Sequence, residues 1–446
     1  MAQEKHAAAR TGGTIAPNGL RKPKWTVPDR SGGRTRRDRV SRGLGKQGVL
    51  LLAVQGLYNT ANALSGTFVP VYLWKASQSF APIGWFALSQ HLMSGLTFWI
   101  VGRWVKQYNK MNSLRIGLIL SGLFYLAVLL LGPAASRYVV PLGALNGLAM
   151  GFFWMAYNVV YFEITEPGNR DRFNGWGGLL GSGAGMIAPW ISGFVIGVFG
   201  AGGYRIVFTV SLVVFATAAV VSFFLAKRRT SGEYDWLYGV RQIRCDGSPW
   251  RRVVPSLMFQ GVREGVFGFL LGLLVFLSTG KEQSLGSFTL WTSLVALVSF
   301  WLAGRVLKPD IRSKAMLAGS FALSIVTMLL FIDVDYRTML WLGIATALFM
   351  PLYIIPMTSA VFDLIGASEA SAGRREELIV LRESGLIAGR VIGLAVYLAV
   401  VARTESAGAL IWLLLIVGAA PLPGWLLLRG RLVRGTANGP AAARGH

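Results

Sequence analysis

The chain contains little charge and almost no cysteine. Charged residues make up 14% of its 446 residues, whereas about 25% is usual in a soluble domain, so a water-facing surface of this size is not expected. The single cysteine, Cys245, excludes an internal disulfide framework and a cysteine-rich metal site. The phosphate-binding pattern Gly-x-x-x-x-Gly-Lys-Ser/Thr does not occur, which argues against an ATP-driven pump. We expect neither an enzyme nor a bound cofactor.

Long hydrophobic runs take the place of the missing charge. Hydrophobic residues make up 53% of the chain, and a helix needs about 20 mostly apolar residues to cross a bilayer core. The runs predict an all-α polytopic membrane protein with twelve transmembrane helices. The twelve segments are 48–74, 80–102, 114–132, 139–162, 174–200, 204–226, 253–279, 284–304, 315–333, 338–362, 376–402 and 406–428.

The basic residues are unevenly distributed. The formal net charge of +24 would also suit a nucleic-acid-binding protein. When the helices are numbered from an inner N-terminus, however, 35 of the 44 Lys and Arg residues lie on the inner side and six lie in outer loops. This is the positive-inside pattern. It predicts an integral protein of the plasma (inner) membrane with both termini cytoplasmic, and it removes the need for a nucleic-acid partner.

The polar segments divide the chain. Residues 1–47 are expected to form a disordered basic cytoplasmic tail, and residues 429–446 a cytoplasmic C-terminal tail. The longest interior connection, the cytoplasmic central loop 227–252, separates a six-helix bundle at 48–226 from a second one at 253–428.

The two bundles carry a weak internal repeat. Residues 98–106, Phe-Trp-Ile-Val-Gly-Arg-Trp-Val-Lys, match residues 300–308, Phe-Trp-Leu-Ala-Gly-Arg-Val-Leu-Lys, at five of nine positions. Gly185 corresponds to Gly385, 200 residues later. Because secondary transporters are commonly built from repeated halves, this repeat predicts two related bundles of six helices.

The sequence of the loop after the second helix resembles a family signature. Residues 102–110, Gly-Arg-Trp-Val-Lys-Gln-Tyr-Asn-Lys, resemble the Gly-rich basic loop signature of the major facilitator superfamily. The chain departs from this signature at Lys106 and Lys308, where the family has an acidic residue. The resemblance implies a two-domain helical bundle with a central cavity, alternating access, a small-molecule substrate and a monomeric state.

The fifth helix has a second resemblance. Residues 181–193, Gly-Ser-Gly-Ala-Gly-Met-Ile-Ala-Pro-Trp-Ile-Ser-Gly, are similar to the Gly/Pro signature of helix 5 in drug–proton antiporters, which implies export. Small residues four apart also let membrane helices pack closely, so the stretch has a purely structural interpretation as well.

Ionisable residues interrupt the apolar helices of the second half, and they are Arg263, Glu264, Arg382, Glu383 and Arg390. Each charge costs about 2.5–3.5 kcal/mol at a helix centre, so we expect these side chains to face a cavity or one another. In a functional interpretation the arginines, with Gln260, bind an anionic substrate, while Glu264 or Glu383 carries a coupling proton. In a structural interpretation they form a buried network between helices 7 and 11.

The first half offers uncharged candidates. Asn59, Tyr157 and Asn158 could form hydrogen bonds with a substrate, and His91 could take part in proton coupling because imidazole titrates near neutral pH. Hydrogen bonding between helices explains the same residues equally well.

Charged residues near the cytoplasmic face are candidates for a gate. Glu163 and Asp363 end helices 4 and 10 at matched positions. Basic residues on the same face are Arg103, Lys106, Arg305 and Lys308. We expect ion pairs between these loops that hold one access state, with ordinary interfacial charge as the alternative.

These features together predict a secondary active transporter that moves a small solute by alternating access. We expect proton coupling, an anionic or amphiphilic substrate and a slight preference for export. A flippase for lipid-linked saccharides on the same fold and a non-transporting membrane receptor or scaffold remain as alternatives. The intramembrane charges favour transport, since a scaffold has no use for them. The expected partners are the substrate, protons and the lipid bilayer.

Overall fold

The structure is a computed structural model, and it describes residues 44–165, 169–226, 233–366, 371, 373–404 and 406–437. Most of the expected N-terminal tail, the start of the central loop and the last residues of the C-terminal tail lie outside this part of the chain. The helices are α2 (Lys46–Ser65), α3 (Val69–Ser77), α4 (Ala81–Gln107), α5 (Lys110–Leu131), η1 (Gly132–Arg137), α6 (Val139–Ile164), α7 (Arg170–Phe199), α8 (Ala201–Ser222), α9 (Tyr238–Arg244), α10 (Trp250–Thr279), α11 (Glu282–Val306), η2 (Pro309–Ile311), α12 (Arg312–Val326), η3 (Thr327–Phe331), α13 (Tyr336–Ile365), α15 (Arg375–Val401), α16 (Ala407–Gly418) and α17 (Pro421–Ala437).

These helices are consistent with the twelve expected membrane spans. Ten helical segments of the described chain are long and apolar enough to cross a membrane. The first expected span is divided into α2 and α3 by a turn at residues 66–68. The span at α4 carries Gln90 and His91 near its middle, which lower its hydropathy. At the other end of the chain, α17 continues into the expected C-terminal tail.

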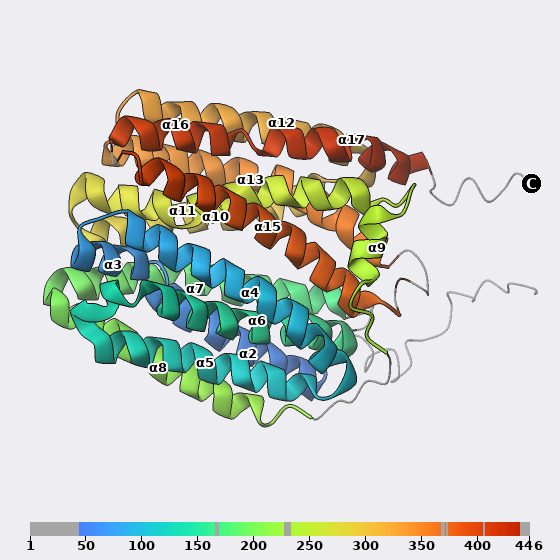
Figure 1. Cartoon of the computed structure of the whole chain (residues 1–446), viewed down its shortest axis with the longest axis horizontal. Helices are drawn as coiled ribbons and strands as arrows, with labels where there is room; N and C mark the ends of the chain where they lie inside the picture. Colours follow the sequence, from blue (N-terminus) through green and yellow to red (C-terminus); the bar gives the residue numbers. More distant parts are fainter. Residues whose placement is uncertain are drawn as a thin grey trace, which may run out of the picture. The chain divides into compact units, whose positions relative to one another are not determined.

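The two halves of the chain have the same internal packing. In the first half α2 packs against α7 and α8, and α4 packs against α6. In the second half α10 packs against α15 and α17, and α11 packs against α13. The halves meet where α4 contacts α15 and where α7 contacts α11. Figure 1 shows them as two adjacent groups of roughly parallel helices, which is consistent with the expected pair of repeated bundles.

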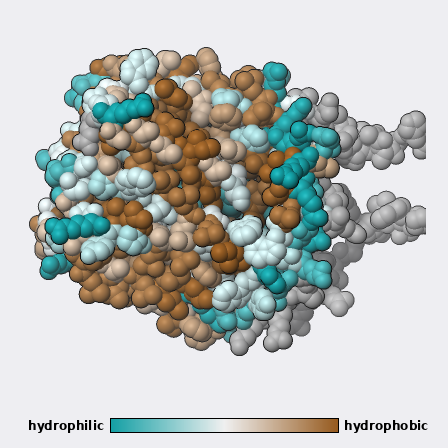
Figure 2. Space-filling view, viewed as in Figure 1, coloured by the Kyte–Doolittle hydropathy of each residue, from teal (hydrophilic) through white to brown (hydrophobic). Residues whose placement is uncertain are grey.

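The outer surface of the helices is apolar. Hydrophobic side chains cover the middle of the face seen in Figure 2, and hydrophilic ones gather toward the two helix ends. Phe224 and Ile416, for example, are 67% and 70% exposed. A bilayer is the solvent in which such a surface is stable, because its core is apolar and about 30 Å thick. The chain is an integral membrane protein. Helix α9 lies across the helix ends on one side (Figure 1), which we call the α9 end, and the opposite side is the far end.

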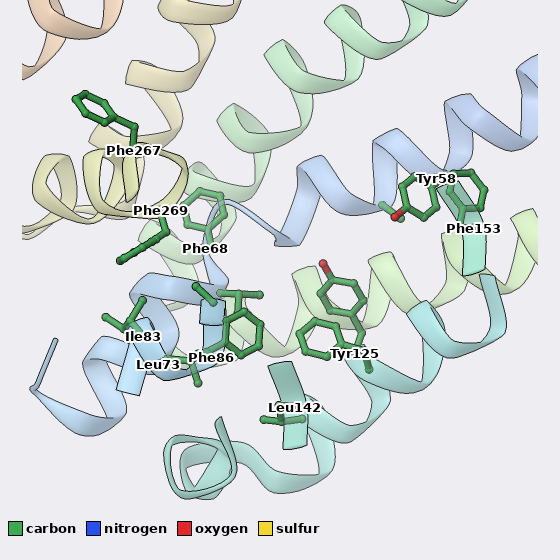
Figure 3. Close-up of a cluster of buried hydrophobic side chains, with 14 of the residues drawn as sticks. Tyr58, Phe68, Leu73, Ile83, Phe86, Tyr125, Leu142, Phe153, Phe267 and Phe269 are labelled. Atoms are coloured by element: carbon green, nitrogen blue, oxygen red, sulfur yellow. The ribbon is translucent and has the colours of Figure 1, made fainter. Parts of the chain in front are cut away.

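Aromatic rings form the core of the first half (Figure 3). Tyr58 of α2 stacks on Phe153 of α6, with ring centroids 3.7 Å apart. Phe215 of α8 packs edge-on against Tyr58 at 5.6 Å and stacks with Tyr125 of α5 at the same distance. Such ring pairs stabilise a core beyond the area that they bury. This cluster holds together the helices that form one wall of the central cavity.

Candidate functional site: a central cavity between the halves

A cavity of about 940 Å³ lies between the two halves, where the family resemblance placed one. The first half contributes Tyr58, Asn59, Asn62, Ala63, Gly66, Val69, Pro70, Ile83, Phe86, Ala87, Gln90, His91, Phe124, Tyr125, Asn146, Met150, Trp154, Gly181 and Gly185 to its lining. The second half contributes Arg263, Glu264, Gly265, Phe267, Gly268, Phe269, Leu271, Thr346, Met350 and Arg390.

Glycines bring the two charged helices of the second half into close contact. A Cβ atom at Gly389 of α15 would lie 1.9 Å from the carbonyl oxygen of Met258, and one at Gly261 of α10 would lie 2.1 Å from that of Leu386. No other residue fits at such separations, since small residues are what allow membrane helices to approach this closely. The contact between α10 and α15 sets the distance between their charged side chains.

Glu264 is held by donors from both helices. Arg390 of α15 donates from Nη2 (2.7 Å) and Nε (3.2 Å) to Oε2 of Glu264. Gln260, one turn earlier on α10, donates from Nε2 to Oε1 at 2.7 Å. The side chains of Glu264 and Arg390 are 24% and 22% exposed, and both line the cavity. The expected proximity of the two charged helices is therefore found at this pair.

Arg263 is the most deeply buried charge of the cavity wall. It is only 3% exposed, and its guanidinium stacks over the ring of Phe267 at 4.3 Å. Its Nε and Nη2 atoms are buried without a hydrogen-bond partner, and it forms no ion pair with a residue that the structure describes. A buried charge without a counter-ion is costly. The formal charges of Arg263, Glu264 and Arg390 give the lining a net charge of +1.

The other candidates from the eleventh helix lie apart from the cavity. Arg382 forms an ion pair with its neighbour Glu383, and its guanidinium lies 5.6 Å from the ring of Phe362 on α13. Neither charged residue belongs to the cavity lining. This pair stays within α15, so it does not join helices 7 and 11; the Arg–Glu contact that the structural interpretation expected between those helices is Glu264–Arg390.

The uncharged candidates are divided between the cavity and the helix interior. Asn59 and His91 line the cavity, whereas Tyr157 and Asn158 do not. Tyr157 is 6% exposed and stacks with Phe153, so the structure gives it a packing role. Three further amides that the sequence analysis did not single out also line the cavity, and they are Asn62, Gln90 and Asn146. The position of Asn62, three residues after Asn59 on the same helix face, could have indicated the first of them.

The α9 end contains a buried ion pair between the halves. Lys106 at the end of α4 reaches Oε1 and Oε2 of Glu377 in the first turn of α15, at 2.7 and 2.8 Å. Glu376 lies 3.7 Å from the same ammonium group. Lys106 and Glu377 are 6% and 3% exposed. The sequence departs from the family signature at Lys106, and the structure supplies the opposite charge from the facing helix.

The described part of the central loop, which begins at Glu233, covers this ion pair. The backbone N–H of Asp235 donates to Oε1 of Glu377 at 3.3 Å, and Arg374 donates to the carbonyl oxygen of Glu233 at 3.1 Å. The indole of Trp236 lies 4.6 Å from that of Trp99 on α4. The connection between the halves thus lies directly over the junction of α4 and α15.

The partners expected for Glu163 and Asp363 need correction. Glu163 forms an ion pair with Lys110, and Asp363 pairs with Arg312 at 2.8 Å. Both pairs join helices of one half, because the end of α6 faces the start of α5, and the end of α13 faces the start of α12. Matched positions in the repeat explain why the two pairs correspond.

The remaining gate candidates contact their own helix or the central loop. Arg103 donates to Gln107 at 2.8 Å and lies 5.9 Å from the ring of Trp236, Arg305 stacks on Trp301 at 3.8 Å, and Lys308 is exposed. Lys106, by contrast, contacts the other half of the protein through Glu377.

Contacts between the two halves also occur at the far end. Glu282 at the start of α11 forms an ion pair with Lys75 of α3 and accepts a hydrogen bond from Tyr204 of α8 at 3.0 Å. The hydroxyl of Tyr397 on α15 donates to the carbonyl oxygen of Phe80, just before α4, at 3.1 Å. Contacts between the halves therefore lie on both sides of the cavity.

The Gly/Pro stretch of the fifth helix serves this far-end contact. A Cβ atom at Gly193 would lie 2.7 Å from the carbonyl oxygen of Glu282, and one at Gly286 would lie 2.7 Å from that of Pro189. The glycines allow α7 and α11 to pack closely, so the structural interpretation accounts for the stretch without reference to export.

Comparisons with known proteins agree with this architecture. The pattern of the Major Facilitator Superfamily matches residues 51–373. "Uncharacterized protein YqgE" of Bacillus subtilis (strain 168) is 40% identical over 370 residues, which are 82% of this chain and 84% of that protein. "Uncharacterized protein in sodM 3'region" of Geobacillus stearothermophilus is 40% identical over 200 residues, which are 45% of this chain and 92% of that protein.

Two solved structures share the fold. A bacterial homologue of the iron transporter ferroportin in its outward-facing state has a TM-score of 0.62 at 15% identity, with 88% of this chain and all of that one covered. The human organic anion transporter MFSD10 (TETRAN) has a TM-score of 0.62 at 13% identity, with 86% of this chain and all of that one covered. With a family match over most of its length and this fold of two six-helix bundles, the chain belongs to the Major Facilitator Superfamily of membrane transporters.

Proposed function

We propose that the chain is a secondary active transporter that moves a small organic anion by alternating access. The observation that carries this proposal is Arg263, a buried guanidinium on the cavity wall without a carboxylate partner in the described chain. An anion in the cavity that contacts this guanidinium would supply the missing counter-charge, because hydrogen bonds between arginine and a carboxylate are charge-assisted. While Glu264 is ionised, one negative charge on the ligand would balance the net charge of +1 on the lining.

The two solved structures suggest different cargoes, and the cavity favours one of them. The chemistry of MFSD10, described as an organic anion transporter, matches an arginine-lined cavity. Iron, named for the ferroportin homologue, needs ligands such as carboxylate, imidazole or thiolate. The described residues include no group of three or more His, Cys, Asp and Glu side chains that could hold a metal ion.

Glu264 is the proposed site of proton coupling. Arg390 and Gln260 together donate three hydrogen bonds to its carboxylate. When Glu264 takes up a proton, its ion pair with Arg390 loses one charge, and the guanidinium becomes available to an anion in the cavity. Proton binding and anion binding would then favour each other, which is the coupling that a symporter requires.

Alternating access would use the contacts on the two sides of the cavity in turn. The Lys106–Glu377 contact closes the α9 end and the Lys75–Glu282 contact closes the far end. We place the α9 end in the cytoplasm of a cell with this protein in its plasma (inner) membrane, because basic residues such as Arg241 and Arg244 of α9 gather there. The transporter is proposed to work as a monomer. Its preferred direction of transport can be measured by comparing flux through protein inserted in each of the two orientations.

The test is transport into proteoliposomes with a panel of organic monoanions, with and without a pH gradient. Arg263→Met should abolish anion transport, whereas Arg337→Met, which removes an exposed arginine at the start of α13, should leave it unchanged. Glu264→Gln should retain anion exchange but lose accumulation driven by the pH gradient. Full anion transport by Arg263→Met would refute the anion-binding role, and unchanged gradient-driven accumulation by Glu264→Gln would refute the coupling role.

The two alternatives give different results in the same assay. A flippase for lipid-linked saccharides would move a fluorescent lipid-linked probe between leaflets and ignore soluble anions. A receptor or scaffold would move neither, and Arg263→Met would then change no flux.

A further inference from the structure

One wall of the cavity is neutral and rich in amides. The amide side chains of the lining, all partly exposed, are Asn59, Asn62, Gln90 and Asn146. They come from α2, α4 and α6 of the first half. In the described chain, every Lys, Arg, Asp or Glu of the lining belongs to α10 or α15 of the second half. The cavity therefore has a charged wall and a facing wall of hydrogen-bonding groups.

The amides have hydrogen-bonding capacity to spare. Each amide offers two N–H donors and a carbonyl acceptor. Asn62 donates to the carbonyl oxygen of Tyr58 at 3.0 Å and also has a hydrogen bond with the side chain of Tyr58. Gln90 donates to the sulfur of Met150 at 3.1 Å. Asn59, Asn146 and the remaining groups of these two amides are available to a ligand. A hydroxyl is the complementary partner, because it also donates and accepts, and an alkyl chain would displace water from these amides without replacing its hydrogen bonds.

The charges argue against two other polar classes of ligand. A zwitterion needs a carboxylate for its ammonium group, but the carboxylate of Glu264 already accepts three hydrogen bonds from Arg390 and Gln260, which leaves one acceptor site on Oε1. While Glu264 is ionised, a dianion would exceed the single net positive charge of the lining. The volume of about 940 Å³ lies within the range of sites for small organic molecules, and it leaves room for a flexible chain of several hydroxylated carbons.

We propose that the transported anion is a polyhydroxylated monocarboxylate, of the kind formed when the aldehyde of a sugar is oxidised to an acid. Its carboxylate binds Arg263, and its hydroxyls bind the amide wall formed by Asn59, Asn62, Gln90 and Asn146. This assignment rests on the proposed anion transport and adds to it the chemistry of the rest of the substrate.

The experiment compares three probes of equal chain length in proteoliposomes: gluconate, hexanoate and glucose. Gluconate has a carboxylate and hydroxyls, hexanoate has the carboxylate alone, and glucose has the hydroxyls alone. We expect saturable gluconate uptake, with a half-saturation concentration at least about 10-fold lower than that of hexanoate, since sites built for hydroxyls reject analogues that lack them. Glucose should be excluded because it leaves Arg263 without a counter-ion.

A matched pair of variants assigns the preference to the amide wall. Asn146→Leu should reduce the preference for gluconate over hexanoate about 10-fold while hexanoate exchange persists. Asn112→Leu removes an exposed amide at the start of α5 and should leave the preference unchanged. A preference that survives in Asn146→Leu would contradict the role of this wall.

The outcomes separate this inference from the proposed function. If hexanoate is carried as well as gluconate and Arg263→Met abolishes both fluxes, the chain is an anion transporter without hydroxyl recognition, and the inference fails alone. If neither anion is carried and Arg263→Met changes nothing across the wider panel, the proposed function fails and the inference with it.

Discussion

Replacing Lys106 by Met should open the α9 end of the cavity. The substitution keeps the length of the aliphatic stem and removes the charge that faces Glu377. Removal of one partner from a buried ion pair typically costs about 3–5 kcal/mol. Here Arg374, 3.2 Å from Oε1 of Glu377, and the N–H of Asp235 remain. We therefore expect a smaller cost of about 2 kcal/mol, or about a 30-fold change in the equilibrium between closed and open states.

The assay measures access to the cavity from each side. In a Cys245→Ser background, which removes the single, exposed cysteine, Met350→Cys places a thiol in the cavity lining. Its labelling by a membrane-impermeant maleimide from the α9 side should be about 30-fold faster with Lys106→Met. The double variant Lys106→Met/Glu377→Met should return toward the original rate, because no buried charge is then left unpaired.

A second ion pair at the same end provides the control. Arg312→Met removes a pair with Asp363 that lies within one half, so it should not change the labelling rate. Labelling that is unaffected by Lys106→Met, or raised equally by Arg312→Met, would refute the assignment of Lys106 and Glu377 to closure of the cavity.

Two further predictions concern close packing and the far end. Gly389→Ala should lower the thermal unfolding temperature, since the new Cβ would lie 1.9 Å from a backbone oxygen, whereas Gly268→Ala meets open space and should not; equal effects of the two variants would contradict the packing argument. Glu282→Gln weakens the ion pair with Lys75 and should increase labelling of the Met350→Cys thiol from the far side. An unchanged labelling rate from the far side would show that this ion pair does not hold the far end closed.

The sequence predicted much of the fold because its signals are local. Each membrane span is a continuous apolar run, and the charges of α10 and α15 stand out against it. The proximity of the charged faces of α10 and α15 could be predicted by the same reasoning, since two isolated charged faces in one bundle are expected to meet. The break between α2 and α3 could not, because the apolar run continues through residues 66–68.

The details that the sequence did not reveal depend on how distant helices are aligned. Lys106 and Glu377 are 271 residues apart, and their contact requires the end of α4 to face the first turn of α15. Which of Arg263 and Arg390 would pair with Glu264 depended on the side-chain directions of two packed helices. The amides of the first half were visible as polar residues, but hydrogen bonding between helices explained them equally well until the structure placed four of them on one wall.

The ion pairs Lys110–Glu163 and Arg312–Asp363 have a consequence for how the duplicated chain has diverged. A lysine and a glutamate in one half correspond to an arginine and an aspartate in the other, so neither side chain is the same although the contact is. At these positions the repeat keeps the interaction although the residues differ. A comparison of the two halves should therefore include contacting pairs as well as identical residues such as the five shared by residues 98–106 and 300–308.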